Sequence, residues 1–459
     1  MKRIRFAMVV GILTFGVAGC GEETPISPAG DIALETAGGR GPAIPSSGHE
    51  CDGLPTAPLS QRVDLYTPTF ANPTSVTNPL FPISELDRVL LLGTVDGGDF
   101  RTETTLLSQT QTIELEGRTV EALVSQYVAW LDRRIHEVAI DWYVQDDLGA
   151  VWYLGEDVFN YDEGRVEDTE GTWLAGKDGP EAMIMPPDPQ VGDVWRPENI
   201  CGFVFEEVTA TATGVTVPGP QGQVSGALVV SELHMDATTE DKIFAPGYGE
   251  FSTGSPGSDI EALALAVQID ALAGPPPAEL EALSSGAARI FRAARARKWN
   301  DASDTVEDMA DAWAAFQALG FVPPLLDAEM ETALEYLVES VDDRDIEETR
   351  QASIDVARAS LDLQLRHLSR DEIDLAQIDL WVRQLLVDAA AHDLGAIRGD
   401  IVSIGLIRDR FAHPPVADID AQIRAVQSAA LAANLSGATE AAVRLQNALA
   451  RSSRGVPRL

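Results

Sequence analysis

The residue composition of the chain changes near residue 258, from strand-forming to helix-forming, and this change limits most strongly what the chain can fold into. Residues 86–257 contain short runs rich in β-branched and aromatic residues, separated by turn sequences such as Asp96-Gly97-Gly98 and Asp162-Glu163-Gly164. Closely spaced runs of this kind are typical of antiparallel strands joined by hairpins. We therefore predict a curved antiparallel sheet or an open barrel in this half.

From residue 258 onward, alanine, leucine, glutamate and arginine follow a helical period. Four turn sequences each place an Asp or Asn near a helix start, as an N-cap requires: Lys298-Trp299-Asn300-Asp301, Arg344-Asp345-Ile346-Glu347, His392-Asp393-Leu394-Gly395 and Asn434-Leu435-Ser436-Gly437. They predict about four helical hairpins, packed as a bundle or, less favoured, a short solenoid. The predicted fold class is α+β and multidomain, with an antiparallel β-domain over 51–257 and an α-helical bundle over 258–455.

Residues 1–19 have the features of a bacterial lipoprotein signal peptide. Basic residues come first, an apolar stretch follows, and Val17-Ala18-Gly19-Cys20 matches a lipobox. We expect Cys20 to carry the lipid and to anchor the protein in the cell envelope. Gly21 follows it in place of an aspartate, which favours the outer membrane if the cell is Gram-negative. Residues 20–50, rich in Pro and Gly, are predicted to form a flexible tether.

Two further cysteines, Cys51 and Cys201, remain after lipidation of Cys20. An even pair in an oxidising compartment predicts one disulfide, which would tie the start of the β-domain to its later strands. The alternative is two buried thiols.

The charge balance excludes some partners. The chain has 72 acidic and 33 basic residues, for a net charge of -39. Nucleic acids and anionic lipid surfaces are bound through clustered Lys and Arg, so neither is expected as a main partner. The membrane contact that we predict is the lipid anchor. The acidic bias is also typical of proteins from saline habitats.

Several segments of the β-half resemble a family of bacterial exported proteins and lipoproteins that has no assigned activity. The resemblance covers roughly residues 75–252 and rests on these segments: Thr77-Asn78-Pro79-Leu80-Phe81-Pro82-Ile83, Asp141-Trp142-Tyr143-Val144-Gln145-Asp146, Val151-Trp152-Tyr153-Leu154-Gly155-Glu156-Asp157, Gly171-Thr172-Trp173, Met183-Ile184-Met185-Pro186-Pro187, Val191-Gly192-Asp193 and Lys242-Ile243-Phe244-Ala245-Pro246-Gly247-Tyr248-Gly249. It implies an extracytoplasmic β-fold and supplies no reaction.

Catalytic motifs are missing from the sequence. It has no nucleophile elbow, phosphate loop, dinucleotide fingerprint or zinc-binding His-Glu-x-x-His helix, and no cofactor is predicted. One enzyme hypothesis remains. Asp141, Glu156 and Asp157 lie beside aromatic residues, and paired carboxylates with aromatics can hydrolyse glycans. The alternative is that these acids are surface charges of a hairpin.

Two metal hypotheses are open. Met183, Met185 and His234 could bind copper, because thioethers and imidazole suit Cu(I); the alternative is that both methionines fill the core. An acidic loop set could bind calcium, with solvated turns as the alternative: Asp162, Glu163, Glu167, Asp168, Glu170 and Asp178.

Arg289, Arg292 and Arg295 recur every three residues and so share one helix face. They could bind an anion or dock the two domains, or they could compensate the dipole at a helix end.

The leading functional prediction is a lipid-anchored envelope protein without catalysis. It would bind a small or apolar ligand in the curved sheet or act as an interaction module for an envelope protein. A glycan hydrolase and a copper-binding protein are the alternatives.

Overall fold

The computed structural model describes residues 51, 53–115, 117–254, 259–411, 417–432 and 434–455. The predicted signal peptide, Cys20 and the tether lie outside the described residues. The chain divides into two compact units. The first, here called the β unit, contains the described residues up to Ile269 except Glu163–Arg165; these three residues and the chain from Asp270 form the second, the helical unit.

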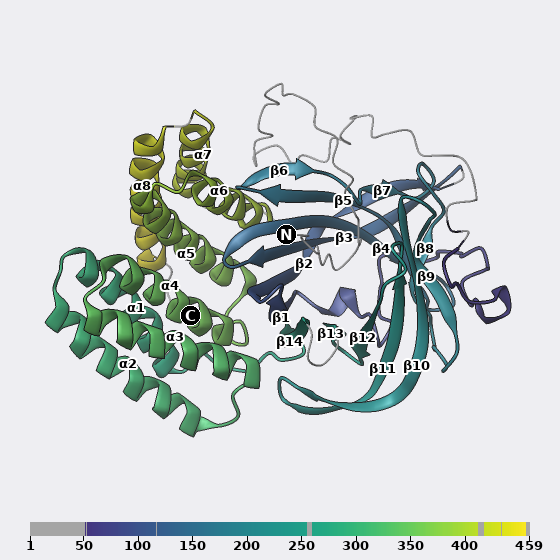
Figure 1. The fold of residues 1–459 in the computed structure, drawn as a ribbon, viewed down its shortest axis with the longest axis horizontal. Coiled ribbons are helices and arrows are strands. Elements are labelled where there is room, and N and C mark those ends of the chain that lie inside the picture. Colours follow the sequence, from purple (N-terminus) through teal and green to yellow (C-terminus); the bar gives the residue numbers. More distant parts are fainter. Residues whose placement is uncertain are drawn as a thin grey trace. The chain divides into compact units, whose positions relative to one another are not determined.

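The β unit is built on one antiparallel sheet of 14 strands. Figure 1 shows its long, curved strands. The strands are β1 (Arg88–Val95), β2 (Gly98–Leu115), β3 (Arg118–Leu131), β4 (Arg134–Gln145), β5 (Val151–Asp162), β6 (Arg165–Asp168), β7 (Trp173–Leu174), β8 (Ala182–Met185), β9 (Val194–Ile200), β10 (Val204–Gly219), β11 (Gly222–His234), β12 (Thr239–Ala245), β13 (Gly249–Gly254) and β14 (Ile260–Val267).

The order of the strands makes two meanders that meet in the middle. Across the sheet the order is β6-β5-β4-β3-β2-β1-β14-β13-β12-β11-β10-β9, so the first and last strands of the chain pair with each other. β8 pairs with β5, and the indole Nε1 of Trp195 on β9 donates to the carbonyl of Ile184 on β8 at 3.1 Å. The sheet therefore curls toward closure without closing, and the predicted curved antiparallel sheet is confirmed.

The predicted domain boundary at 257/258 is wrong. Residues 260–267 form β14, which pairs with β1 on one side and with β13 on the other. The sequence of this strand, Ile-Glu-Ala-Leu-Ala-Leu-Ala-Val, is made largely of good helix formers. Pairing on both edges outweighs that local preference, and the two units divide after Ile269.

Residues 53–87, here called the strap, run along the sheet mainly without regular structure, apart from the 3-10 turns Leu59–Gln61 and Ile83–Glu85. Buried Asn78 fixes the strap by donating through Nδ2 to the carbonyls of Gly149 and Pro186, each at 2.9 Å. The amide of Gly247 donates to the carbonyl of Pro79 at 2.8 Å. These hydrogen bonds hold the strap against the sheet.

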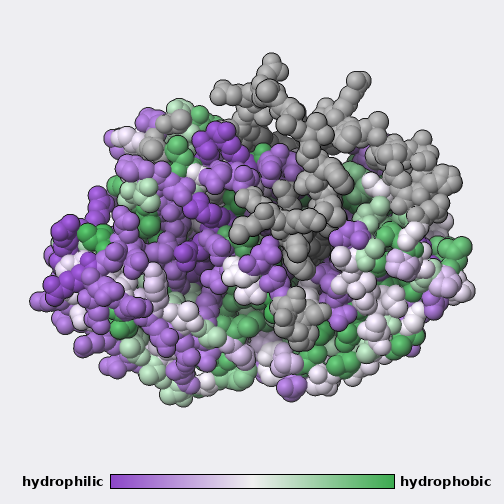
Figure 2. Space-filling model, viewed as in Figure 1, coloured by the Kyte–Doolittle hydropathy of each residue, from purple (hydrophilic) through white to green (hydrophobic). Residues whose placement is uncertain are grey.

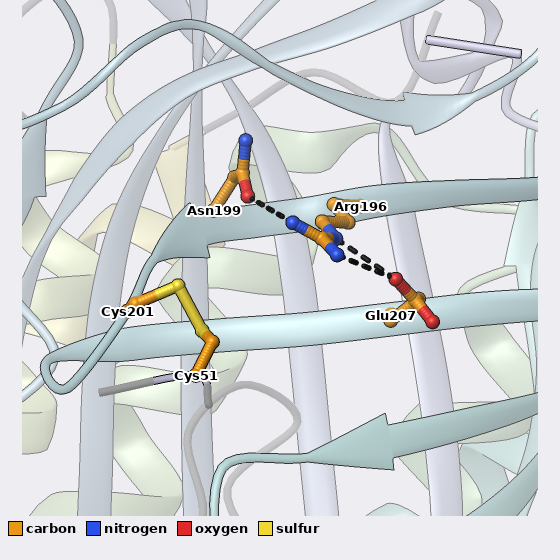
Figure 3. The surroundings of a disulfide bond; sticks show 5 residues. All are labelled: Cys51, Arg196, Asn199, Cys201 and Glu207. Carbon is orange, nitrogen blue, oxygen red and sulfur yellow. Dashed lines mark hydrogen bonds and ion pairs between the residues drawn. A yellow bond between two sulfur atoms is a disulfide. The ribbon is translucent and has the colours of Figure 1, made fainter. Parts of the chain in front are cut away.

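A disulfide joins Cys51, which precedes the strap, to Cys201 after β9, with their Cα atoms 5.2 Å apart, and so confirms the predicted pairing. Figure 3 shows Arg196 beside it, donating from Nε and Nη2 to Oε2 of Glu207 at 2.9 and 2.8 Å and from Nη1 to Asn199 at 3.0 Å. Oε1 of Glu207 accepts from the amide of Ala57 at 2.6 Å. The start of the strap is thus held by the neighbouring disulfide and by a hydrogen bond from Ala57 to the ion-paired carboxylate of Glu207.

The helical unit contains the helices α1 (Ala278–Arg295), α2 (Trp299–Leu319), α3 (Pro324–Asp343), α4 (Ile346–Gln364), α5 (Arg370–Ala391), α6 (Leu394–Asp409), α7 (Ala417–Leu431) and α8 (Leu435–Gly455). α1 to α4 pack in a ring in which α1 contacts α2 and α4, and α3 contacts the same two helices. α5 to α8 repeat this arrangement, and α4 contacts α5. The unit is therefore two four-helix bundles in sequence, which agrees with the bundle prediction.

Three of the four predicted helix caps are present. The carboxylate of Asp345 accepts from the amides of Glu347 and Glu348, and that of Asp393 from the amide of Ala396. The side chain of Asn434 accepts from the amide of Gly437. The fourth turn supplies no cap of this kind, because α2 begins at Trp299 after Lys298, and Asn300 and Asp301 both lie inside its first turn.

The surface of the helical unit that Figure 2 presents is mainly hydrophilic, with scattered apolar side chains. Among the described residues, no helix has both the length and the apolar character that crossing a bilayer requires.

Candidate functional site

The inner face of the curved sheet and the end of the strap enclose a cavity of about 100 Å³. On this scale one water molecule takes about 10–15 Å³, so the space equals roughly seven to ten waters. Apolar and aromatic side chains make up most of the wall. Phe81, Pro82 and Ile83 of the strap contribute to it, and so do Val208 and Phe244 of the sheet.

Ionisable side chains interrupt this apolar wall. Six carboxyl groups and one ammonium group line the cavity, namely Glu137, Asp141, Glu198, Glu206, Glu232 and Glu250 with Lys242. They come from strands β4 and β9 to β13, and all seven residues are buried. Because side chains alternate between the two faces of a strand, the spacings Glu137-x-Ala139-x-Asp141-x-Tyr143 and Lys242-x-Phe244 carry each set to the inner face.

Like charges lie directly opposite each other on neighbouring strands of this face. Register pairs Glu206 with Glu198 across β10 and β9, and Glu232 with Glu240 across β11 and β12. Asp141 of β4 is opposite Glu156 of β5. Directly opposed like charges destabilise a sheet unless protons or cations neutralise them. Three such pairs on one buried face therefore lower the stability of the fold.

His234 and Lys242 neutralise part of the cluster. Nδ1 of His234 lies 3.6 Å from Oε1 of Glu206, and its Nε2 lies 3.9 Å from Oε1 of Glu232. Nζ of Lys242 lies 2.8 Å from Oε1 of Glu232 and 3.7 Å from Oε1 of Glu240. Two cations thus serve three carboxyl groups.

The neighbouring charges move the pKa values of these groups. Burial disfavours the charged imidazole of His234, but the Glu206 carboxylate and then Glu232 outweigh this and raise its pKa to about 9. Burial would raise the pKa of Glu206, yet His234 and Lys242 hold it below the usual range. Burial and the charge of Glu206 raise the pKa of Glu232 to about 8. His234 is therefore a cation paired with Glu206 at neutral pH.

A second group of acids has no such cation. Glu156 and Glu198 are both fully buried, and among the described residues no nitrogen or hydroxyl donor reaches their carboxyl oxygens; the two carboxyls interact with each other instead. Burial raises the pKa of each well above its usual range, and so do the neighbouring acids, Glu198 acting on Glu156 and Glu206 acting on Glu198. These two carboxyls therefore retain protons that exposed glutamates would lose.

Asp141 links this group to the aromatic wall. Its Oδ1 accepts from the hydroxyl of Tyr153 at 2.7 Å, while burial raises its pKa to about 7. Tyr153 stacks on Tyr143 with ring centroids 4.8 Å apart, and Phe81 of the strap meets the edge of Tyr143 at 5.2 Å. The acids therefore lie next to a stack of aromatic rings that extends to the strap.

A bulge in β5 is what turns Glu156 inward. The register between β4 and β5 shifts between Asp141 and Tyr143, so that Tyr153 and Glu156 both face the cavity side, although they are three residues apart. Gly155 lies in the bulge with a φ of +120°, and a Cβ there would lie 2.2 Å from the carbonyl oxygen of Trp173. Glycine is required at this position by both conformation and space.

The structure brings together two of the three acids of the enzyme hypothesis, Asp141 and Glu156. Half-buried Asp157 follows Glu156 and so points to the opposite face of β5. Glu156 is completely buried and lies behind the wall of the cavity.

The residues of the copper hypothesis have other surroundings. Met183 and Met185 are fully buried on β8, which pairs with β5. His234 lies among carboxylates on β11. Among the described residues, one group has metal-ligand proximity, namely Glu206, Glu232 and His234, with ligand atoms within 4.8 Å of one another. Oxygen-rich sets of this kind suit harder ions than Cu(I).

The remaining candidate sites lie elsewhere. Arg289, Arg292 and Arg295 are exposed on α1, where they share one face as predicted. In the predicted calcium set, Asp168 accepts from the side chain of Asn160 and the amide of Glu170, and Asp178 from the amide of Leu174. These two carboxylates therefore stabilise turns.

The comparisons with known proteins give no family. No protein-family model matches the chain, and no curated protein matches it significantly. The resemblance to exported proteins and lipoproteins therefore stays a prediction.

Sequence reasoning missed most of the site. It selected Asp141, Glu156 and His234, but not Glu137, Glu198, Glu206, Glu232, Lys242 or Glu250. The available signal was an acid two or four residues from another charged residue inside a strand, as in Glu137-x-x-x-Asp141, Glu232-x-His234 and Glu240-x-Lys242. Such spacing places the charged residues on one face of a strand. Whether that face is buried depends on the curl of the sheet, which the spacing does not give.

Proposed function

We propose that the β unit is a non-catalytic binding module for a small organic ligand, which it holds in the cavity between the inner face of the sheet and the strap. The observation that carries the proposal is the cavity itself, a concave and mainly apolar space with a few convergent polar groups. These are the usual features of small-molecule sites. Attachment to the envelope through Cys20 is part of the same proposal.

The strap supports this proposal because it is a separate covering layer. Phe81, Pro82 and Ile83 line the cavity, and Asn78 and the disulfide at Cys51 fix the segment on either side of its exposed stretches. A covered cavity removes a ligand from water, and that burial supplies most of the affinity for apolar groups.

The test is to extract the protein from its own membrane and to measure its mass by native mass spectrometry. A co-purifying organic mass that is lost in a cavity-filling variant supports the proposal. Thr104→Phe fills the cavity, because half-buried Thr104 lines it on β2. Thr94→Phe on β1 is the matched control, since Thr94 is exposed and outside the cavity wall. Equal retention of the mass by both variants contradicts the proposal.

A glycan hydrolase is the second candidate, because Asp141 lines the cavity and lies opposite Glu156. Two carboxyl groups with separated pKa values can act as acid and base. If this hypothesis is right, the purified protein cleaves an envelope glycan, and Asp141→Asn abolishes the cleavage while Asp157→Asn leaves it intact. Absence of turnover on envelope glycans contradicts it, and so does turnover that survives Asp141→Asn.

An interaction module for an envelope protein is the remaining form of the proposal. It predicts that crosslinking in the intact envelope captures one defined partner, and that the cavity variant Thr104→Phe does not change this capture.

A further inference from the structure

We propose that the ligand of the cavity is a small organic cation, with an ammonium group that binds Glu198 and an apolar or aromatic body that packs on the rings beside it. This inference rests on the proposed function and specifies the chemistry of its ligand. It follows from the charge balance of the cavity, the unpartnered groups in its wall and its aromatic lining.

The first observation is a shortage of positive charge. Six carboxyl groups line the cavity against the single ammonium of Lys242, and His234 at its edge adds one cation. Both cations lie at the Glu206, Glu232 and Glu240 end of the cluster. Glu198 and Glu156 share the same buried region, and no ion pair within 4 Å reaches either of them among the described residues.

The second observation is that buried polar groups of the wall lack donors from nitrogen or hydroxyl groups. Glu198 is 1% exposed and lines the cavity, and among the described residues its oxygens meet the Glu156 carboxyl instead of such a donor. The hydroxyl of Tyr127, which is 4% exposed and also lines the cavity, lacks a partner as well. A buried polar group without a partner is costly. An ammonium group supplies up to three hydrogen-bond donors and a positive charge, which are the two things that the Glu198 carboxyl lacks.

The third observation is the aromatic wall. Phe81, Tyr143, Tyr153 and Trp195 all line the cavity beside the acids, and Tyr143 and Tyr153 are stacked. Aromatic faces attract cations and pack well on flat apolar bodies. The cavity volume of about 100 Å³ suits a ligand of roughly ten non-hydrogen atoms.

A bare metal ion fits these observations less well. The group closest to metal-ligand geometry, Glu206 with Glu232 and His234, already holds Nζ of Lys242 at 2.8 Å from Glu232. A metal ion there would also leave the apolar wall unoccupied. An organic cation uses the carboxyl groups and the apolar wall together.

Binding of such a cation exchanges a proton for a positive charge. Burial and the charges of Glu206 and Glu232 raise the pKa of Glu198, while Lys242 acts to lower it, and the net effect is a raised pKa. The carboxyl therefore holds a proton while the site is empty and releases it when an ammonium takes its place. Affinity for the cation should rise with pH as long as the ligand amine keeps its own proton.

The experiment compares two probes of equal size on the full chain by isothermal titration calorimetry. 2-Phenylethylamine is a cation at neutral pH, and 2-phenylethanol has the same skeleton with a neutral hydroxyl. We expect the amine to bind at least tenfold more tightly. Glu198→Gln should remove this difference by weakening the amine at least tenfold while the affinity for the alcohol stays the same.

Glu207→Gln is the matched control, because Glu207 is equally buried but lies on the other face of the strands, paired with Arg196. It should leave the preference for the amine unchanged. Circular dichroism of each variant checks that the fold is kept. Should the Glu198 variant fail to fold, wild-type titrations at pH 6 and pH 8 decide, since the inference requires tighter binding of the amine, but not of the alcohol, at pH 8.

The other outcomes separate the two proposals. Equal affinity for amine and alcohol overturns the organic cation and leaves the binding module standing. Binding of neither probe, with no co-purifying organic mass, contradicts the binding module itself. Tight binding of ZnCl₂ that His234→Ala abolishes, without preference for the amine, overturns the organic cation in favour of a metal site.

Discussion

Buried acidic residues have cationic partners in the helical unit of this protein, whereas several of those on the inner face of the sheet do not among the described residues. In the helical unit, Asp374 is fully buried. Its Oδ1 lies 3.7 Å from Nη1 of Arg410, and its Oδ2 lies 3.9 Å from Nε of Arg370. Asp420 likewise meets Arg408 at 2.8 Å. On the inner face of the β unit, Glu198 and Glu156 are buried to the same extent without a cation among the described residues.

This difference teaches where to look for function. A buried ion pair can belong to the fold alone, whereas a buried acid without a partner costs stability and requires another reason. Such departures from the rules of folding concentrate at functional sites. The predictions below test the contrast between a neutralised helical core and an acidic sheet interior.

The largest expected effect is a loss of β-unit stability as the pH rises. Glu232 and Glu261 have pKa values raised to about 8, and Asp141 to about 7. They hold protons in the folded chain at pH values where the unfolded chain has lost them, so stability falls as the pH rises from about 4.5 to 8. The raised pKa of His234, about 9, extends this loss to higher pH. Glu206, with its lowered pKa, acts in the opposite direction.

Urea unfolding followed by tryptophan fluorescence at pH 5 and pH 8 measures this effect. Each raised group contributes roughly 1.4 kcal/mol per pH unit over its window, so we expect a difference of several kcal/mol. Glu261→Gln removes one such group and should flatten the pH profile. A β unit that is equally stable at both pH values would refute the charge imbalance.

The next effect is in the helical core. Arg410→Met removes the buried cation beside Asp374 and should lower the free energy of unfolding by about 3 kcal/mol, because the buried carboxylate loses a cation and keeps the partly exposed Arg370 at 3.9 Å. Arg451→Met is the control. It breaks an exposed pair with Asp418 and should cost less than about 1 kcal/mol. Ellipticity at 222 nm during urea unfolding reports both values, and equal losses would contradict the distinction.

The disulfide should stabilise the β unit alone. Replacing Cys51 and Cys201 by alanine opens a link between residues 150 positions apart and should lower the free energy of unfolding by about 2–4 kcal/mol. The fluorescence transition of the β unit reports this loss, and the ellipticity transition of the helices should not move. A matching shift of the helical transition would show that the two units unfold together.

The smallest effects compare two buried glutamates of the β unit. Glu207→Gln disrupts an ion pair in which Nε and Nη2 of Arg196 both donate to Oε2, and it should cost about 1.5–3 kcal/mol. Glu198→Gln removes a carboxyl without a partner and should leave stability unchanged or raise it. Thermal unfolding of the two variants beside the wild type measures the contrast. A larger loss for Glu198→Gln than for Glu207→Gln would show that Glu198 is a structural residue.

Local signals in the sequence predicted much of the fold. Hairpin turns such as Asp96-Gly97, whose residues both adopt positive φ, and helix caps such as Asp345 act through their own backbone neighbours. The boundary at 257/258 failed because β14 has a helix-forming sequence that only its partners β1 and β13 hold extended. The cap expected in the turn Lys298-Trp299-Asn300-Asp301 is missing because α2 already starts at Trp299.

By itself, the sequence determined the strand-rich and helix-rich halves, the hairpin turns, three of the caps and the cysteine pair, because each depends on local geometry or on composition. Only the tertiary structure decided that Glu198 of β9 lies against Glu156 of β5 and Glu206 of β10, and that Phe81 of the strap meets Tyr143. These residues are far apart in the chain, and the curl of the sheet brings them together. Acidic residues of one strand form a site only when the facing strands are also acidic and water is excluded. The local sequence of a strand contains no information about the strands that will face it.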